Sequence, residues 1–287
     1  MTLPKFDYVV ANSLEEASQL AAEKAGHAMV MAGGTDVIVM LQSRGIPQID
    51  TVIDLKPIQG MDQIAFEEGN GLHVGALAKL FALQSSPVVQ EHIPAVADAA
   101  HYVASAQIRR KGTMAGNICN ASPSADTAPI LVAMNATVKT TQRDIPIDEF
   151  FKGVKRTCLA PGEIVTEIVI PELKSGEGSA YFKHSVRKAM DLAIIGVAAW
   201  VKMDGKKVAD CRIAMGGVGI TPLRAKEAEA LLTGQVISDE LLEKVGTAAA
   251  ESCHPISDVR ASAEYRTDMV RVYTKRAIKK AIETMKA

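Results

Sequence analysis

The chain of 287 residues has few aromatic side chains and few cysteines. Phe, Trp and Tyr make up 4% of the sequence, which argues against a nucleic-acid surface built from stacked aromatic rings. The four cysteines, Cys119, Cys158, Cys211 and Cys253, lie far apart and form no CxxC pair. We therefore expect no metal site, no iron–sulfur cluster carried by this chain and no disulfide framework. Free thiols in a reducing compartment are the simpler interpretation.

An excess of charge of one sign is also missing, because 32 Lys and Arg residues are balanced by 33 Asp and Glu residues. This balance gives no electrostatic reason to expect a polyanion or a charged membrane as partner. The longest apolar stretch, Leu192–Val201, is interrupted by Gly196 and is about half as long as a membrane span. Met1–Val10 has no signal-peptide pattern. The sequence therefore predicts a cytoplasmic protein that neither binds nucleic acid nor enters a membrane.

Hydrophobic residues make up 48% of the chain, which is enough for a large core, and the length suits two domains. The first part mixes short strands with helices. Strands are expected at 7–10, 28–31, 51–55, 72–75 and 163–170, and helices at 14–25, 37–42, 95–104 and 128–134. The stretch 112–129 is rich in Gly, Asn, Ser and Pro, and we expect it to be an irregular functional loop.

The clearest linker is 171–179 (PELKSGEGS), because it combines Pro, Lys, Ser and repeated Gly with little to bury. We therefore expect domains at 1–174 and 178–287. After the linker, apolar runs at 193–203 and 208–215 flank Asp204-Gly205, which is a strong hairpin signal. Helical patterns follow at 225–232, 239–250 and 263–285. The predicted fold class is α+β, with a mixed first domain and a smaller C-terminal domain of antiparallel sheet and helices.

Two glycine-containing loops are candidates for ligand binding. Ala32-Gly33-Gly34-Thr35-Asp36 follows a predicted strand, and Gly112–Asn117 (GTMAGN) opens the irregular stretch. Glycines let successive backbone N–H groups converge on an anion, although either loop alone could be a plain tight turn. Together, without a Lys in either loop, they predict a cradle that holds a diphosphate with neutral donors. Gly216-Gly217-Val218-Gly219 follows a predicted strand but lacks the third glycine of a dinucleotide fingerprint, so a Rossmann-type site is not expected there.

Asp126 has two possible roles. It precedes a predicted helix, so its carboxylate could cap the helix N-terminus. A carboxylate can also accept hydrogen bonds from the hydroxyl groups of a sugar or a ribityl chain. Spacing alone leaves both roles open.

Five segments in the same order resemble one known family, the FAD-binding subunits of the molybdenum hydroxylases. This family includes xanthine dehydrogenases, carbon monoxide dehydrogenases of the molybdenum type, and related aldehyde and N-heterocycle hydroxylases. The resemblance extends over nearly the whole chain, and the segments are AGGTD at 32–36, GTMAGNICNASPSADTAP at 112–129, TCLAPGEI at 157–164, Lys183 with RKAMDLA at 187–193, and SAEYR at 262–266. One departure is Ala115, which stands where many members have glycine.

The resemblance implies an FAD-binding domain of the vanillyl-alcohol-oxidase (PCMH) type, followed by a C-terminal domain special to the family. It also implies a set of residues around FAD. The diphosphate lies between two loops, which contribute Ala32, Gly33, Gly34, Thr35 and Asp36 on one side and Thr113, Gly116, Asn117 and Asn120 on the other.

Further residues are assigned by the same resemblance. Asp126 holds the ribityl or ribose hydroxyls, and Leu159 and Lys183 lie beside FAD, with Lys183 towards the isoalloxazine ring. Asp191 and Leu192 border the flavin face where an electron acceptor docks. No residue of the chain is expected to act as a catalytic acid, base or nucleophile or to bind a metal.

The resemblance implies an electron-transfer subunit of an oxidoreductase complex. Its expected partners are a large molybdopterin-binding subunit and a small subunit with two [2Fe–2S] clusters, assembled as a dimer of heterotrimers. Electrons pass from the clusters to FAD and then to NAD⁺ or another acceptor. The branch with an additional [4Fe–4S] insertion is disfavoured, because the chain lacks a cysteine cluster. A stand-alone FAD-dependent reductase and a non-catalytic FAD-binding module are the alternatives.

Overall fold

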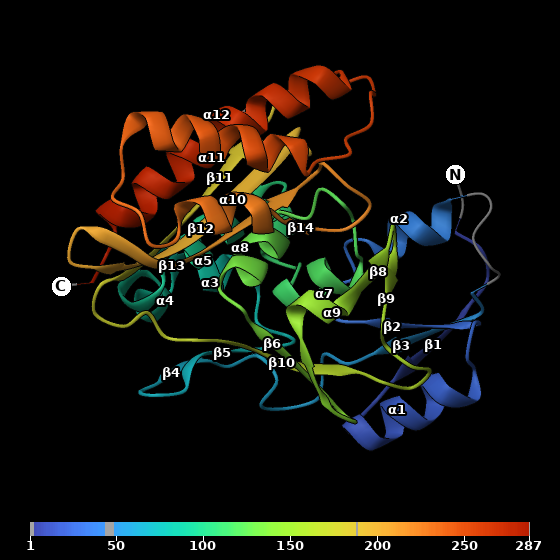
Figure 1. The fold of residues 1–287 in the computed structure, drawn as a ribbon. Coiled ribbons are helices and arrows are strands. Elements are labelled where there is room, and N and C mark those ends of the chain that lie inside the picture. Colours follow the sequence, from blue (N-terminus) through green and yellow to red (C-terminus); the bar gives the residue numbers. More distant parts are fainter. Residues whose placement is uncertain (1–2, 44–48, 188, 287) are drawn as a thin grey trace.

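The computed structural model describes residues 3–43, 49–187 and 189–286, and it has the predicted α+β class (Figure 1). Helices and sheets are stacked in layers. The C-terminal helices cover one face of a four-stranded sheet, a group of short helices covers its other face, and a five-stranded sheet lies beyond that group (Figure 1). A small parallel sheet with the N-terminal helices flanks this stack (Figure 1).

The small sheet contains β1 (Asp7–Val10), β3 (Thr51–Asp54) and β2 (Ala28–Met31), all parallel and in that order. Helix α1 (Leu14–Glu23) connects β1 to β2, and α2 (Val37–Gln42) follows β2. These elements agree with the predicted strands and helices. Because the strands are parallel, their carboxyl ends share one edge, and the first glycine loop leaves the sheet from that edge.

The five-stranded sheet is antiparallel, and its strands come from distant parts of the chain. In order across the sheet they are β4 (Ile64–Glu67), β5 (Gly71–Gly75), β10 (Val165–Ile170), β6 (Thr137–Thr140) and β7 (Asp144–Pro146). The short helices of the middle layer and its edge are α3 (Leu80–Ser85), α4 (Pro87–His92), α5 (Pro94–Tyr102), α6 (Ala106–Arg109), α7 (Met114–Cys119), α8 (Thr127–Ala133) and α9 (Ile147–Phe150). A two-stranded hairpin, β8 (Phe151–Gly153) and β9 (Arg156–Thr157), projects beside α7 and α2 (Figure 1).

The C-terminal domain contains a four-stranded antiparallel sheet covered by three helices. Its strands are β11 (Glu177–His184), β12 (Ile195–Asp204), β13 (Lys207–Gly216) and β14 (Leu223–Arg224), and its helices are α10 (Lys226–Leu232), α11 (Asp239–Glu251) and α12 (Ala263–Glu283). Asp204 pairs with Lys207 across a two-residue turn, in which Gly205 has a φ of +56°. The predicted hairpin and the three predicted helices are confirmed.

The first part of β12, residues 195–201, is largely buried on both faces, which explains why it carries no charged side chain. Val197, Ala199 and Val201 face the core formed with the C-terminal helices. Ala198 belongs to the core of the first domain instead. The hydrophobic cores of the two domains therefore pack against opposite faces of this sheet.

The linker predicted at 171–179 is shorter in the structure, because Glu177–Ser179 belong to β11 and are buried. A Cβ atom on Gly178 would lie 2.0 Å from the carbonyl oxygen of Ala281 in α12. Gly178 thus allows strand and helix to approach closely, and the prediction mistook this packing glycine for a flexible one.

The prediction of an irregular stretch at 112–129 was also partly wrong. It contains α7, and α8 begins within it at Thr127. The hydroxyl of Thr113 accepts a hydrogen bond from the N–H of Gly116 at 2.9 Å, so a good N-cap starts a helix despite the glycine. Ala115, the departure from the family pattern, is buried in this helix.

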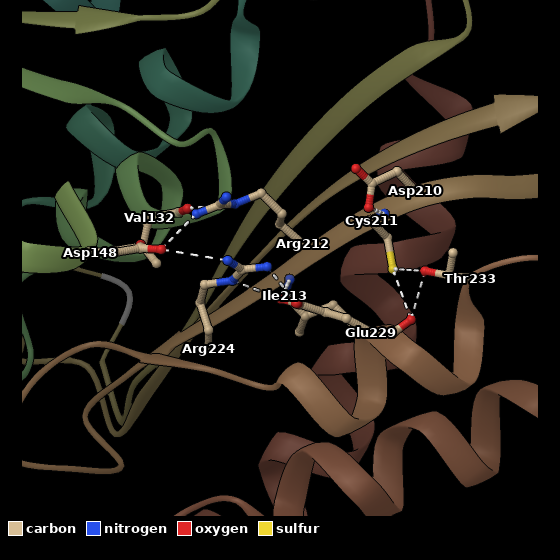
Figure 2. A network of polar contacts seen from close by, with 9 residues as sticks. All are labelled: Val132, Asp148, Asp210, Cys211, Arg212, Ile213, Arg224, Glu229 and Thr233. Atoms are coloured by element: carbon tan, nitrogen blue, oxygen red, sulfur yellow. Dashed lines mark hydrogen bonds and ion pairs between the residues drawn. The ribbon is translucent and has the colours of Figure 1, made fainter. Parts of the chain in front are cut away.

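A cluster of charged side chains joins the two domains at strands β13 and β14 of the shared sheet (Figure 2). Arg212 of β13 donates to the Val132 carbonyl at 3.2 Å and to the Asp148 carboxylate at 3.0 Å. Arg224 of β14 lies 3.5 Å from the same carboxylate and also donates to Glu229 of α10. Burial and the neighbouring Arg224 lower the pKa of Arg212, and the partly exposed Asp148 acts in the opposite direction.

No helix in the described ranges is long and apolar enough to cross a membrane.

Candidate functional site

The two glycine loops lie directly against each other. A Cβ atom on Gly33 would be 2.1 Å from the carbonyl oxygen of Lys111 and 2.8 Å from the Cα of Gly112. A Cβ atom on Gly112 would lie 3.5 Å from the Thr35 hydroxyl oxygen. Residue 33 must therefore be glycine for the loops to meet, since any side chain would push them apart.

The first loop leaves three consecutive backbone donors available. Gly34 has a φ of +76°, a conformation that glycine adopts without strain. Among the described residues, none accepts a hydrogen bond from the backbone N–H groups of Gly33, Gly34 or Thr35, and all three residues are half-buried. Successive free N–H groups in such a turn form a concave site for an anion.

A polar chain fixes the outer part of this loop. The Asn120 side chain donates to the Asp36 carboxylate at 2.9 Å, and its oxygen accepts from the Lys155 ammonium at 2.6 Å. The N–H of Lys155 also donates to the carbonyl of Ala121 at 2.9 Å. The first loop, the second loop and the β8–β9 hairpin are thus held together by the side chains of Asp36, Asn120 and Lys155.

The remaining predicted residues of the second loop act on its internal geometry. Thr113 caps α7, as described above, and the Asn117 side-chain oxygen accepts from the Thr127 hydroxyl at 2.6 Å and from its N–H at 3.4 Å. These bonds connect the first turn of α8 to α7 and keep the residues between the helices in one conformation.

Asp126 lies at the start of α8, but its side chain does not cap that helix. One carboxylate oxygen accepts from the Tyr181 hydroxyl at 2.9 Å, and the other accepts from the Lys183 ammonium at 2.9 Å. Both partners belong to β11 of the C-terminal domain. The capping role left open by the sequence is therefore wrong, and Asp126 joins the two domains.

Lys183 uses all three of its donors inside the protein. Besides Asp126, the ammonium donates to the carbonyl of Tyr102 at 3.0 Å and to the carbonyl of Asp191 at 2.8 Å. The side chains of Lys183 and Asp126 are 4% and 8% exposed, so this is a buried ion pair.

Burial dominates the electrostatics of this pair. It raises the pKa of Asp126, while the positive charge and hydrogen bond of Lys183 and the hydrogen bond of Tyr181 act in the opposite direction. Burial and the adjacent carboxylate raise the pKa of Tyr181 well above its usual value, so that hydroxyl remains a donor. In this buried position, the charged side chains of Asp126 and Lys183 stabilise each other.

The backbone carbonyl of Asp191 accepts a hydrogen bond from Lys183, whereas its carboxylate accepts from the N–H of Arg187 at 3.0 Å. That backbone bond is the largest cause of the lowered pKa of Asp191. Leu192 is 46% exposed, and Met190 and Val186 beside it are also exposed. Residue 188, within the predicted 187–193 segment, lies outside the described residues.

Leu159 is the predicted residue with the weakest connection to the others. It follows β9, is half-buried against the core of the first domain, and its N–H donates to the Thr157 hydroxyl at 3.4 Å. The hairpin before it reaches the second loop through Lys155, but among the described residues no hydrogen bond joins Leu159 to either glycine loop.

Tyr181 and Lys155 were missed in the sequence. A signal for Tyr181 was available, because it stands two residues before Lys183 in one strand, and side chains at i and i+2 point to the same face. Lys155 offered no such signal, since it lies in a turn with a φ of +58°.

A second hollow lies on the five-stranded sheet, away from these residues. Its volume is about 450 Å³, and its lining includes His73, Glu67 and Glu167. His73 is already engaged, with Nδ1 3.1 Å from Glu167 and Nε2 3.5 Å from Glu67. Over the described ranges, no group of three His, Cys, Asp or Glu residues is arranged to hold a metal ion. We therefore place the functional site at the glycine loops.

Comparisons with known proteins identify the family of the chain. Residues 4–173 match the family described as the FAD binding domain in molybdopterin dehydrogenase, and residues 180–281 match the CO dehydrogenase flavoprotein C-terminal domain. The chain is 33% identical over 280 residues to the glyceraldehyde dehydrogenase medium chain of Sulfolobus acidocaldarius, covering 96% of this chain and 98% of that protein. It is 31% identical over 280 residues to a putative xanthine dehydrogenase FAD-binding subunit of Escherichia coli, covering 96% and 95%.

A solved structure gives the same result for the fold. The carbon monoxide dehydrogenase of Hydrogenophaga pseudoflava, in a form that lacks the Mo-pyranopterin moiety of its molybdenum cofactor, matches with a TM-score of 0.95 and 33% identity over 100% of both chains. The three relatives are named for different substrates, although the chain matches nearly all of each of them.

Proposed function

The chain belongs to the family of FAD-binding subunits of molybdenum hydroxylases, and we propose that it carries electrons from a [2Fe–2S] partner subunit to NAD⁺ or another acceptor. FAD is its cofactor, and it is a flavoprotein subunit of an oxidoreductase. We place the FAD-binding domain at 1–174 and the C-terminal domain at 178–287. The limits of the two matched families, 4–173 and 180–281, support this division.

The observation that supports FAD binding is the set of N–H groups on Gly33, Gly34 and Thr35, which lie beside the second loop and have no acceptor among the described residues. This arrangement fits a diphosphate, because it offers several donors and room for close approach of the backbone. Thr113, Gly116, Asn117 and Asn120 would complete the cradle from the second loop. The absence of a lysine from either loop is consistent with recognition by neutral donors.

The other end of the proposed site is formed by the buried group around Lys183. Asp126 would orient ligand hydroxyls through lone pairs that Tyr181 and Lys183 leave free, since each carboxylate oxygen can accept more than one hydrogen bond. The exposed side chain of Leu192 would lie at the open edge, where an acceptor approaches. FAD, when bound, supplies the redox chemistry, and the protein supplies binding, orientation and access.

We further propose the partners and location that the family implies. These are a large molybdopterin-binding subunit and a small [2Fe–2S] subunit, arranged as a dimer of heterotrimers in the cytoplasm. The four free cysteines support a reducing compartment. The substrate of the complex would be chosen by the large subunit, which agrees with the different substrates named for relatives of this one chain.

Reconstitution tests the proposal directly. The FAD-loaded chain is mixed with the complex's organic substrate, alone and with its two partner subunits, and bleaching of the visible flavin band is followed without oxygen. We expect bleaching only in the full complex, because the sequence has no cysteine cluster and the described residues form no metal site through which electrons could enter. Bleaching by the lone chain would contradict the relay and favour a stand-alone reductase. Failure of the purified chain to bind FAD would contradict the proposed site itself.

A further inference from the structure

Two segments of the proposed flavin site come from different domains and must be held at a fixed separation. One is the turn Pro123–Asp126 before α8, and the other is Asp191–Ile194 before β12. Lys183 makes the first connection between them, since its ammonium bonds both to the Asp126 carboxylate and to the Asp191 carbonyl.

Arg266 makes a second connection between the same two segments. It belongs to α12 and is 3% exposed. Its guanidinium donates to the carbonyl of Ile194 and, at 3.2 Å, to the carbonyl of Gly217. The N–H of Gly217 in turn donates to the carbonyl of Pro123 at 2.7 Å. Arg266 therefore contacts one segment directly and reaches the other through a single residue.

The geometry around Gly217 leaves little freedom for this connection. Gly217 has a φ of +77°, and a Cβ atom there would lie 2.9 Å from the carbonyl oxygen of Ile194. The neighbouring Gly216 lies close to the first domain, because its Cβ would lie 3.0 Å from the Pro129 ring. Glycine at 216 thus allows the two domains to approach each other, and glycine at 217 allows the close contact with Ile194.

The guanidinium itself is held in place by Asp258. The carboxylate accepts from Arg266 at 2.9 Å and also from the N–H of Arg260 at 2.8 Å. The backbone bond from Arg260 and the bonds from Arg266 lower the pKa of Asp258 to about 2, so it stays ionised. Because the guanidinium is planar and rigid, its Nη1 donates to both carbonyls while its Nη2 stays paired with Asp258.

We propose that Arg266 is a positioning residue for the flavin, which acts through Gly217 and Ile194 to set the separation of Pro123–Asp126 and Asp191–Ile194. The inference rests on the proposed function, because it assumes that FAD contacts these two segments. In this proposal Arg266 acts through the backbone and does not contact the flavin itself. Its loss would alter the environment of the flavin rather than remove a ligand.

The test compares Arg266→Gln and Arg266→Lys with Arg224→Gln as a matched control. Arg224 is also an interdomain arginine, but its bonds go to Asp148 and Glu229 in the cluster of Figure 2, away from both segments. The measurements are the FAD dissociation constant, the visible spectrum and fluorescence of bound flavin, the flavin reduction potential and the melting temperature, all on the full chain.

We expect Arg266→Gln to weaken FAD binding by about 10-fold or more, which corresponds to the loss of one good charged hydrogen bond. We also expect its flavin spectrum and potential to shift, with Arg266→Lys intermediate. Arg224→Gln should lower the melting temperature yet keep the wild-type spectrum and potential. If Arg266→Gln does not fold, the spectrum and potential of Arg266→Lys decide.

A wild-type spectrum and potential in the Arg266 variants would overturn the inference, even if they melt at lower temperature. The same shifts in Arg224→Gln would overturn it too, because the effect would then belong to any weakened domain contact. Absence of FAD binding in the wild-type chain would instead contradict the proposed function, so the two failures can be distinguished.

Discussion

The two halves of the proposed site are built from different kinds of groups. The half in the first domain consists of backbone N–H groups, small residues and neutral side chains around Gly33, Gly34 and Thr113. The half at the domain boundary consists of buried charges, with Asp126 and Lys183 as an ion pair. The first half depends on shape, since a single added carbon atom would meet the backbone of the other loop.

The charged half depends on pairing instead. An ionised group in the interior is stable only while its partner is present. Substitutions in this half should therefore change both the free energy of unfolding and the affinity for FAD. A shape-dependent half can lose its ligand while the chain stays folded. This difference predicts separable effects of substitution in the two halves.

The largest effect is expected from Lys183→Met. It leaves the carboxylate of Asp126 buried without its cation, which typically costs about 3–5 kcal/mol of unfolding free energy. Denaturant unfolding of the apo-protein measures it. The double variant with Asp126→Asn should recover much of the loss, because no charge is then left unpaired. A loss in the double variant equal to that in Lys183→Met would show that packing, and not charge, governs this half.

Lys183→Met should also change how the stability of the protein depends on pH. The folded-state pKa of Asp126 is already raised by burial, and it should rise further without Lys183. A carboxyl group whose pKa is raised on folding makes the folded state less stable as the pH increases above the ordinary Asp value of about 3.9. Thermal melting of Lys183→Met should therefore fall more steeply than that of the wild type from pH 4 upwards.

Gly34→Val should abolish or greatly weaken FAD binding. A branched side chain disfavours the φ of +76°, and its Cβ would lie 2.9 Å from the Met31 sulfur. Gly26→Val is the control, because Gly26 has a similar φ of +82° with nothing within 4 Å of a Cβ. Both variants should lose about 1–2 kcal/mol of stability from backbone strain. Only Gly34→Val should lose FAD in a fluorescence titration, and equal FAD affinities would reduce the first loop to a simple turn.

Asp148→Asn should have a smaller effect, because Asp148 is partly exposed and its pairs with Arg212 and Arg224 are screened. We expect a loss of about 1 kcal/mol, reduced in high salt, without a change in FAD affinity. Asp268→Asn, which removes an exposed pair with Arg271 within one helix, is the control and should be nearly neutral. A drop in FAD affinity in Asp148→Asn would extend the charged half of the site to the cluster of Figure 2.

The last expected effect concerns Asp258, whose contribution to stability is lost in acid. Its pKa is lowered on folding to about 2, from an ordinary value of 3.8. Its contribution to stability is therefore complete above the ordinary value and is lost as the pH falls through about 2. The melting temperatures of the wild type and Asp258→Asn should converge as the pH falls from 3.8 to about 2. Curves that stay parallel would show that the carboxylate contributes nothing through its charge.

Many helices and strands were predicted from the sequence, because local patterns determine them, whereas strands such as β4, β6, β7 and β11 were not. The Asp204-Gly205 turn, the capped helix at Ala263 and the apolar strands follow from spacing and turn chemistry alone. Gly178 could not be interpreted in this way. A glycine needed for close packing and a glycine in a flexible linker look alike until the partner, Ala281, is known.

The same limit applied to the site. The two glycine loops were visible as motifs, but their contact through Gly33 and Lys111 joins residues far apart in sequence. The charge of Asp126 was visible, whereas its ion pair with Lys183 depends on how the second domain sits on the first. Sequence patterns thus identified the groups, and tertiary structure determined their partners.

The short connection between the domains has a consequence for synthesis of the protein. The chain passes between β10 and β11 through residues 171–176. A ribosome therefore releases the whole first domain, with Asp126, before Tyr181 and Lys183 have emerged. Until β11 is synthesised, the Asp126 carboxylate has no cation to pair with and is more stable in contact with water. We therefore expect the turn before α8 to remain unfolded until then. Loading of the cofactor should accordingly begin only late in translation, when α12 and Arg266 have closed the second domain.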